Sequence, residues 1–210
     1  MNLPLTQEQI MIREMVREFA RSEIEPVAQE YNRRGEFPHE IIKQLGELGL
    51  YGMMVPQNYG GSEAGAVSYS LALQEIAYAC ASAAVTLSVT NLTTEPLIHF
   101  ATEEQKRNYL APMASGEYIG AFAITEPEAG SDPSSLKTSA VKKGGRYVLN
   151  GTKQFITNGA YAGIFILIAR TSAEKNGLTA FLIPKGTKGL RVGREEDKMG
   201  LNASNTVEII

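Results

Sequence analysis

The chain has 210 residues, of which 43% are hydrophobic and 20% charged, a composition typical of a globular protein with one large or two small domains. The net charge of −3 argues against nucleic-acid binding, and the one cysteine, Cys80, excludes an internal disulfide. No apolar run is long enough to span a bilayer, and the N-terminus lacks the pattern of a signal peptide. We therefore expect no membrane contact and a cytoplasmic or mitochondrial-matrix location.

The first 116 residues carry apolar side chains at helical spacing, which predicts an all-α N-terminal domain. A capping box formed by Thr6 and Gln9 predicts the start of the first helix. Pro26 is expected to bend or end that helix, because proline lacks the N–H that a helix interior needs. A second helix is expected to begin at Pro38, whose fixed φ suits a first turn.

The later part of this half is richer in alanine and leucine. Residues 67–84 predict one nearly all-apolar, buried helix, and a further helix is expected over 85–100. Pro96 is expected either to break the latter or to begin a new helix. A second capping box at residues 102–105 predicts the last helix, which Gly116 ends.

From residue 117 onward, short apolar runs alternate with turn residues, which predicts β-strands. The expected strands are 119–125, 136–142, 146–156, 164–170, 178–184, 189–193 and 206–210. Gly144–Gly145 predicts a hairpin turn, and Asn150–Gly151 a turn or bulge. Strands at this spacing favour an antiparallel barrel or sandwich over a parallel sheet. The predicted fold class is α+β, with a helical domain at 1–116 and an incomplete β-barrel domain at 117–210, truncated within a strand.

Two segments of the β-half end in hydroxyl and amide donors. One is Ala121–Asp132, which breaks at Pro127, and the other is Lys153–Gly159. A flavin needs donors along its N1/C2=O edge, where reduction places negative charge, and one near N5. The candidate donors and neighbours for such a ring are Ile124, Thr125, Gly130, Ser131, Phe155 and Thr157. An ordinary strand, turn and threonine-rich hairpin would have the same composition, so the motif alone leaves both interpretations open.

The stretch Ala121–Asp132 resembles the signature of the acyl-CoA dehydrogenase family, and Asn150–Gly159 is similar to a second family motif. Further family-like pieces follow in family order across the chain: Phe37–Pro38, Glu47–Gly52, Pro56–Gly61 and Gly200–Leu201. The resemblance implies an N-terminal α-domain, a middle β-domain and a C-terminal four-helix domain. The implied reaction is FAD-dependent α,β-dehydrogenation of an acyl-CoA thioester, with hydride transfer to flavin N5.

The resemblance also assigns roles to individual residues. It implies that Ile124 and Thr125 hydrogen-bond the pyrimidine end of the flavin and that Thr157 reaches N5. Phe155 stands where many members have tryptophan and is expected to pack beside the ring, while Ser131 is expected to bind the cofactor or the CoA moiety. The other residues of the expected cofactor set are Phe122, Gly130 and Ile156.

Residues 87–97 resemble the wall of the acyl pocket, with Thr90 and Thr94 as candidate substrate contacts. Hydroxyls that bond back to their own helix are an equal alternative for each of them. In members that act on dicarboxylic acyl chains, an arginine on this segment pairs the distal carboxylate. Ala84 stands at that place, which favours an uncharged acyl group.

Other polar residues are expected to play smaller parts. His39 is expected at the surface and His99 in the core, and with one cysteine they make no metal site. Glu126 is expected to have a structural or solvent-facing role rather than a catalytic one. Residues 193–198 are expected to form a solvated loop.

No residue of the chain is a candidate for the base that removes the α-proton, which in the family is a glutamate of the C-terminal domain. We therefore expect a fragment of an acyl-CoA dehydrogenase that is inactive alone. The full protein is expected to be a homotetramer of β-oxidation or amino-acid catabolism that passes electrons to an electron-transfer flavoprotein. An acyl-CoA oxidase-like flavoenzyme and a non-catalytic module that binds flavin or acyl-CoA are the alternatives. Neither the chain length of the acyl group nor the acceptor follows from the sequence.

Overall fold

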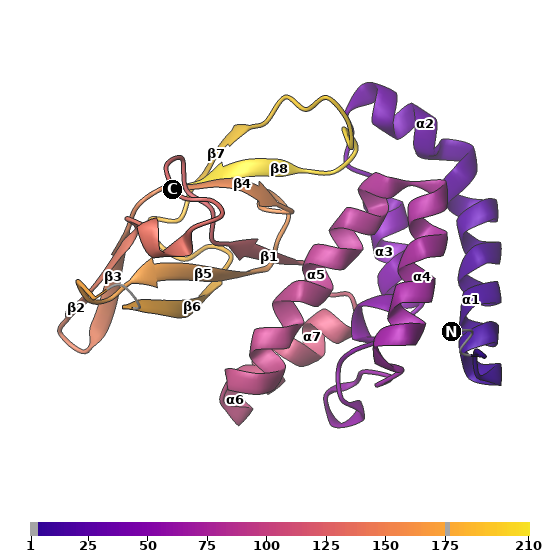
Figure 1. Ribbon diagram of the computed structural model, residues 1–210, viewed down its shortest axis with the longest axis horizontal. Helices are drawn as coiled ribbons and strands as arrows, with labels where there is room; N and C mark the ends of the chain where they lie inside the picture. Colours follow the sequence, from indigo (N-terminus) through magenta and orange to yellow (C-terminus); the bar gives the residue numbers. More distant parts are fainter. Residues whose placement is uncertain (1–3, 175–176) are drawn as a thin grey trace. The chain divides into compact units, whose positions relative to one another are not determined.

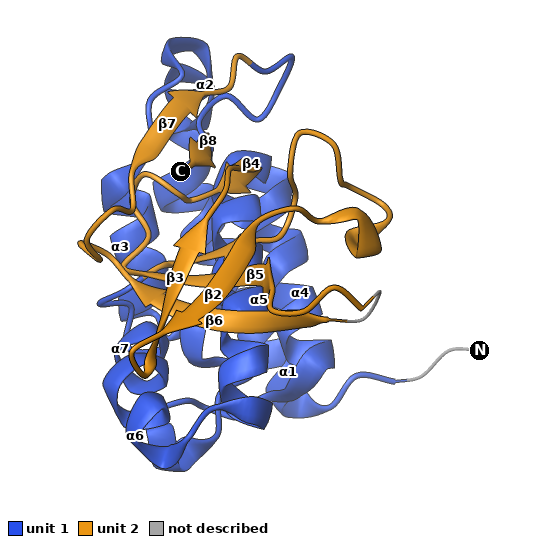
Figure 2. Ribbon diagram, turned by 90° about the vertical axis from the view of Figure 1, so that its left-hand side faces the viewer, with its two compact units in different colours: residues 1–118, 198–204 blue, residues 119–197, 205–210 orange. Residues whose placement is uncertain are grey.

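The computed structural model describes residues 4–174 and 177–210, which divide into two compact units (Figure 2). Unit 1 comprises Met1–Tyr118 and Lys198–Ser204, and unit 2 comprises Ile119–Asp197 and Asn205–Ile210. Helices make up the first and strands dominate the second, so the predicted α+β fold class is confirmed. The boundary between residues 116 and 117 stays a prediction.

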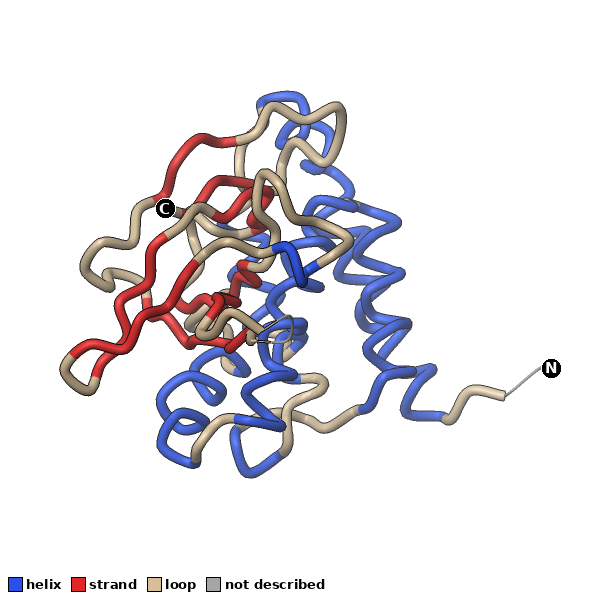
Figure 3. The backbone as a smooth tube through the Cα atoms, turned by 60° about the vertical axis from the view of Figure 1, so that its left-hand side comes forward, coloured by secondary structure: helices blue, strands red, loops and turns tan. Residues whose placement is uncertain are grey.

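Unit 1 is built mainly of α-helices, with a long connection between Glu47 and Gly65 that holds two short 3-10 turns (Figure 1). The described helices are α1 (Gln7–Phe19), α2 (Glu25–Arg34), α3 (His39–Glu47), α4 (Gly65–Ala79), α5 (Ala81–Phe100), α6 (Glu103–Gln105) and α7 (Ala111–Ala114). The long helices α1, α4 and α5 lie side by side in Figure 1, with α4 in contact with both of the others. Figure 3 distinguishes the helices, in blue, from the strands, in red. None of the helices described combines the length and the apolar character that crossing a bilayer would require.

Both capping boxes form as predicted. The Thr6 hydroxyl accepts the N–H of Gln9 at 3.2 Å, and the Gln9 side chain accepts the N–H of Thr6 at 3.0 Å. Pro26 does not end the helical path: the π-turn Ala20–Ile24 comes just before it, and α2 continues to Arg34. The wider turn lets the chain accept a residue without an N–H, and Figure 1 shows the axis changing direction there.

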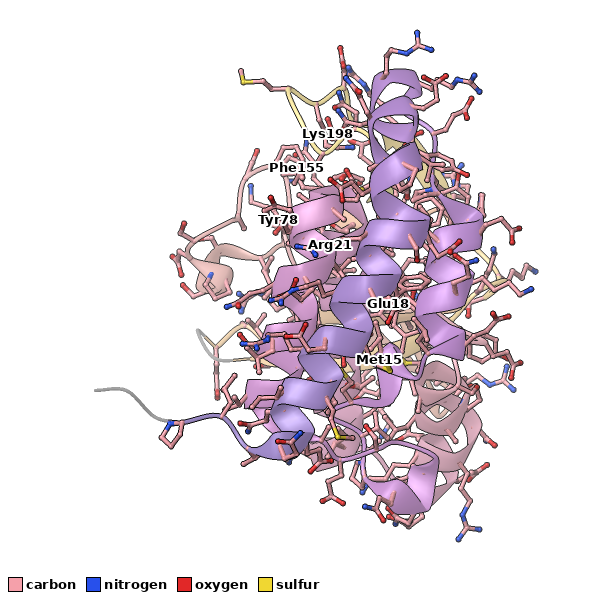
Figure 4. The ribbon with its side chains drawn as sticks, turned by 90° about the vertical axis from the view of Figure 1, so that its right-hand side faces the viewer. Met15, Glu18, Arg21, Tyr78, Phe155 and Lys198 are labelled. Carbon is pink, nitrogen blue, oxygen red and sulfur yellow. The ribbon has the colours of Figure 1, made fainter. Side chains whose placement is uncertain are left out.

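The expectation of one buried helix over 67–84 was wrong. The helix α4 stops at Ala79, Cys80 is extended, and α5 begins at Ala81. No glycine or proline marks this break, so composition could not reveal it. Burial is also confined to one face, and Tyr78, labelled in Figure 4, is 81% exposed. Pro96 lies inside α5 and neither breaks the helix nor begins another.

Unit 2 contains two sheets that do not close on one another, so the barrel is incomplete as expected. The described strands are β1 (Gly120–Ala123), β2 (Ser139–Lys143), β3 (Arg146–Asn150), β4 (Lys153–Thr157), β5 (Ile164–Arg170), β6 (Leu178–Pro184), β7 (Val192–Glu195) and β8 (Thr206–Ile209). One sheet has the order β1-β5-β2-β3, with β6 also paired to β5, and the other has the order β4-β8-β7. Most pairs are antiparallel, but β1 and β2 each run parallel to β5, which the short alternating runs did not predict.

Two further strand predictions need correction. The expected strand 146–156 is split between the two sheets at Gly151, where a Cβ would meet Thr138 Oγ1 at 2.4 Å. Only glycine fits so close a contact. The expected loop 193–198 begins as strand β7, because charged residues are well placed on the outer strand of a small sheet. The core between the strands is rich in small residues, among them Ala121 and Ala123 of β1.

Candidate functional site

The two segments predicted to bind a flavin meet within unit 2. The N–H of Gln154, in β4, donates to the carbonyl of Thr125 at 2.8 Å, just after β1 ends. The side chain of Lys153 donates to the carbonyl of Ile124 at 2.9 Å. The carbonyls of Ile124 and Thr125 are therefore both held by the second segment, although Lys153 lies 29 positions after Ile124.

Phe155 has an unusual backbone conformation for an aromatic residue. Its φ is +58°, in the left-handed region, and its side chain is 56% exposed. The pairing of β4 with β8 shifts register between Lys153 and Ile156, so Phe155 lies in a bulge. Backbone strain combined with an exposed ring costs the fold stability and is typical of binding sites.

The neighbours of Phe155 point in different directions. Ile156 is buried in the core of unit 2, whereas Thr157 is half-buried and pairs with Thr206 of β8. Phe122, Ile124 and Thr125 are also half-buried. The half-buried hydroxyls and the exposed ring thus lie on the two segments that the sequence singled out.

The loop after β1 presents Gly130 and Ser131 at the surface. It begins with a tight turn in which Glu126 and Ala129 exchange two backbone hydrogen bonds. A Cβ on Gly130 would meet nothing within 4 Å, so the protein's own packing does not require glycine there. Asp132 accepts from the N–H of Ser134 at 3.0 Å and caps the following turn, which is a structural role.

Beneath these residues lies a buried ion pair, which the sequence did not single out. Lys153 is 1% exposed and Glu126 7% exposed, and Lys153 Nζ lies 2.8 Å from Glu126 Oε1. The carboxylate also accepts the backbone N–H groups of Lys137 at 2.6 Å and Thr138 at 2.9 Å. The structural role expected for Glu126 is therefore present, and it joins the start of the loop, the entry to β2 and β4.

The pair's electrostatics follow from this environment. Burial raises the pKa of Glu126, but hydrogen bonds from Lys153 and from the backbone N–H groups of Lys137 and Thr138 outweigh it and hold the pKa at about 2. Burial lowers the pKa of Lys153, against the opposing attraction of Glu126. A lysine on an inward-facing strand position, with a glutamate inside the neighbouring motif, was the signal that could have identified the pair.

The candidate acyl-wall residues belong to unit 1, where α5 carries a buried polar stripe. Thr90 Oγ1 donates to Thr86 O at 2.9 Å, Thr93 Oγ1 to Thr90 O at 2.6 Å, and Thr94 Oγ1 to Asn91 O at 2.8 Å. These hydroxyls bond back to their own helix, which was the alternative left open. Their role toward a substrate stays a prediction.

The histidines behave differently from one another. His39 lies exposed in the first turn of α3, as expected. The core position expected for His99 was wrong: its side chain is 62% exposed and lies 3.4 Å from Glu95. His99 lies two positions after the buried Leu97, which turns it to the opposite face of α5. Within 4–174 and 177–210, no three His, Cys, Asp or Glu side chains gather as they would around a metal.

A helical unit followed by a β-unit with two open sheets defines an α+β protein. The family models described as "Acyl-CoA dehydrogenase, N-terminal domain" and "Acyl-CoA dehydrogenase, middle domain" match residues 6–117 and 121–210. The chain belongs to the acyl-CoA dehydrogenase family, and the resemblance drawn from its motifs is confirmed.

Individual relatives agree with this assignment. An acyl-CoA dehydrogenase of Bacillus subtilis is 50% identical over 209 residues, which are 98% of this chain and 55% of that protein. The structure of butyryl-CoA dehydrogenase from Megasphaera elsdenii matches with a TM-score of 0.95 at 39% identity, over 100% of this chain and 57% of the other. Glutaryl-CoA dehydrogenase from Mycobacterium smegmatis, in complex with FADH2, matches with a TM-score of 0.92 at 34% identity, over 98% and 53%. The chain thus spans about half the length of the relatives it matches.

Proposed function

We propose that this chain forms the flavin-facing part of an FAD-dependent enzyme that dehydrogenates acyl-CoA thioesters between the α- and β-carbons. The observation that carries the proposal is the joining of Ile124–Thr125 to β4 by hydrogen bonds from Lys153 and Gln154. It brings together the two donor-bearing segments in a chain of the acyl-CoA dehydrogenase family.

The residues present fit a flavin. In the proposed complex, Ile124 and Thr125 hold the pyrimidine edge, Thr157 donates near N5, and the ring of Phe155 packs beside the isoalloxazine. The open space at Gly130 allows backbone to approach a ligand closely, and Ser131 is exposed beside it. Phe122 and the backbone of Ile156 complete the set. When bound, FAD supplies the oxidant that takes the β-hydrogen with its electron pair.

The proposed substrate is an acyl-CoA with an uncharged acyl group, with Ser131 toward the CoA moiety and Thr90 and Thr94 toward the acyl chain. Ala84, which is buried, supports the uncharged group because it offers no cation for a distal carboxylate. For the whole protein we propose a homotetramer that passes electrons to an electron-transfer flavoprotein, in the cytoplasm or in a mitochondrial matrix.

The test is the visible absorption spectrum of the full protein that the gene encodes, recorded after loading with FAD and dialysis. Retained flavin bands that butyryl-CoA bleaches under exclusion of oxygen are the expected result, with glutaryl-CoA as the matched comparison that bleaches far less. A protein that binds no FAD, or whose flavin no acyl-CoA bleaches, contradicts the proposal. Rapid reoxidation of the bleached flavin by oxygen would indicate an oxidase instead of a dehydrogenase.

The same spectrum tests the catalytic base. The 210 residues alone are expected to leave the flavin oxidised in the presence of butyryl-CoA. Dehydrogenation needs a protein base that removes the α-proton, and none of these residues is a candidate for it. Bleaching by the 210-residue chain would show that it contains its own base.

A further inference from the structure

The peptide group between Ile124 and Thr125 is oriented by one buried side chain. Its carbonyl accepts a hydrogen bond from Lys153 Nζ at 2.9 Å. The peptide bond is planar and trans, so the N–H of Thr125 points away from Lys153, opposite to that carbonyl. The hydrogen bond from the Lys153 ammonium therefore helps to fix the direction in which the Thr125 N–H points.

The ammonium has little freedom to move. It is almost fully buried and makes a second hydrogen bond, at 2.8 Å, to Glu126. Glu126 is itself held by the N–H groups of Lys137 and Thr138, on the far side of the loop. The charge of Lys153 thus sits at one fixed point, in surroundings where water does not screen it.

A charge hydrogen-bonded to a carbonyl polarises the whole peptide group. Electron density drawn toward the carbonyl oxygen leaves the N–H on the opposite side a stronger donor, because hydrogen bonds in a chain reinforce one another. The negative carboxylate of Glu126 beside the ammonium reduces this effect. The two charges therefore act on the Thr125 N–H in opposite directions.

We propose that Lys153 is a positioning residue that strengthens the Thr125 N–H as a donor to the flavin and so favours the reduced cofactor, while Glu126 limits this effect. The inference rests on the proposed function, in which Thr125 faces the pyrimidine edge of FAD. That edge gains negative charge on reduction, so a stronger donor stabilises the reduced form more than the oxidised form.

If the ion pair of Lys153 and Glu126 only stabilised the fold, its variants would have a different effect on the cofactor. Removal of either charge would then loosen the loop and β4, and both variants would change cofactor binding in the same direction. The proposal predicts opposite directions, because Lys153→Met removes the polarising charge and Glu126→Gln removes the charge that counters it. The direction in which the reduction potential of the flavin shifts therefore distinguishes an electrostatic effect on the flavin from a purely structural role of the pair.

The experiment measures the two-electron reduction potential of bound FAD, and the dissociation constants of oxidised and reduced FAD, in the protein as its gene encodes it. Lys153→Met is expected to make the potential more negative and to lower the preference for reduced FAD by about tenfold, a typical coupling between sites. Glu126→Gln is expected to make the potential more positive. Lys142→Met, an exposed lysine on β2, is the matched control and should leave both unchanged.

The possible outcomes are distinct. Potentials that shift in the same direction in both variants, or in neither, overturn the inference and leave the proposed function standing. Failure of the unaltered protein to bind FAD overturns both. Should Lys153→Met not fold, the double variant Lys153→Met with Glu126→Gln leaves no unpaired buried charge, and its potential must still lie below that of the unaltered protein.

Discussion

Both units bury polar side chains, but they satisfy them over very different distances along the chain. On α5, Thr90, Thr93 and Thr94 each bond to a carbonyl three or four residues earlier in the same helix. In unit 2, Lys153 and Glu126 reach each other across 27 residues. The first arrangement depends on one helix, and the second depends on three separate segments.

This difference determines what each arrangement can do. A hydroxyl that bonds within its own helix adds little to the tertiary structure, since the helix forms without it. A buried charge pair between segments holds those segments in one arrangement, and the loss of either partner leaves the other charge buried without compensation. We therefore expect substitutions in unit 2 to have the larger effects.

The largest effect is expected for Lys153→Met. The substitution removes one partner of the buried pair and strands the carboxylate of Glu126, which should lower the free energy of unfolding by about 3 kcal/mol. Chemical denaturation followed by circular dichroism measures the change. Lys142→Met, at the surface, should stay within about 0.5 kcal/mol. Equal stability of the two variants would show that the pair contributes nothing to the fold.

The free energy of unfolding at acidic pH should also depend on this pair. The pKa of Glu126 is about 2 in the folded protein, well below the value of about 4 for a glutamate in an unfolded chain. A carboxyl group with a lowered pKa stabilises the fold above its unfolded pKa, and this contribution disappears as the pH falls toward 2. The unaltered protein should therefore lose roughly 2 kcal/mol over that range because of Glu126 alone.

Glu126→Gln is the comparison for that profile. The amide keeps the shape of the side chain but does not titrate, so the variant should be less stable near neutral pH and should lose less stability on acidification. Unfolding free energies measured at several pH values give both slopes. Parallel slopes would show that other carboxyl groups account for the acid sensitivity.

Phe155→Asn should separate stability from binding. Asparagine tolerates a positive φ far better than phenylalanine does, and little apolar surface is lost because the ring is more than half exposed. The fold should be unchanged or more stable by about 1 kcal/mol, whereas FAD should bind more weakly. Thermal unfolding and flavin fluorescence measure the two effects, and a clear loss of stability would show that the ring supports the fold.

Much of the architecture could be predicted because its causes are local. The capping boxes at Thr6 and Thr102, the strands of residues 164–170 and 178–184, and the turn at Gly144–Gly145 all follow from neighbouring residues. The donor segments around Thr125 and Thr157 were also recognisable, since each carries its own motif.

The features that could not be predicted depend on contacts between distant residues. The break at Cys80 carries no glycine or proline, and the parallel pairing of β1 with β5 joins strands that are far apart in the sequence. The buried ion pair of Lys153 could not be predicted for the same reason. Its partners, Glu126 and Ile124, lie far from Lys153 in the sequence. Local patterns located the candidate site, but only the fold revealed what supports it.

The smallest effect is expected for Thr94→Val on α5. The valine keeps the shape of the threonine and removes only a hydroxyl that donates to Asn91 O at 2.8 Å, a carbonyl of the same helix. Because hydrogen bonds of this kind contribute little to stability, the cost should be at most about 1 kcal/mol by chemical denaturation. A cost as large as that of Lys153→Met would mean that the threonine stripe holds unit 1 together, and the contrast between local and long-range polar contacts would fail.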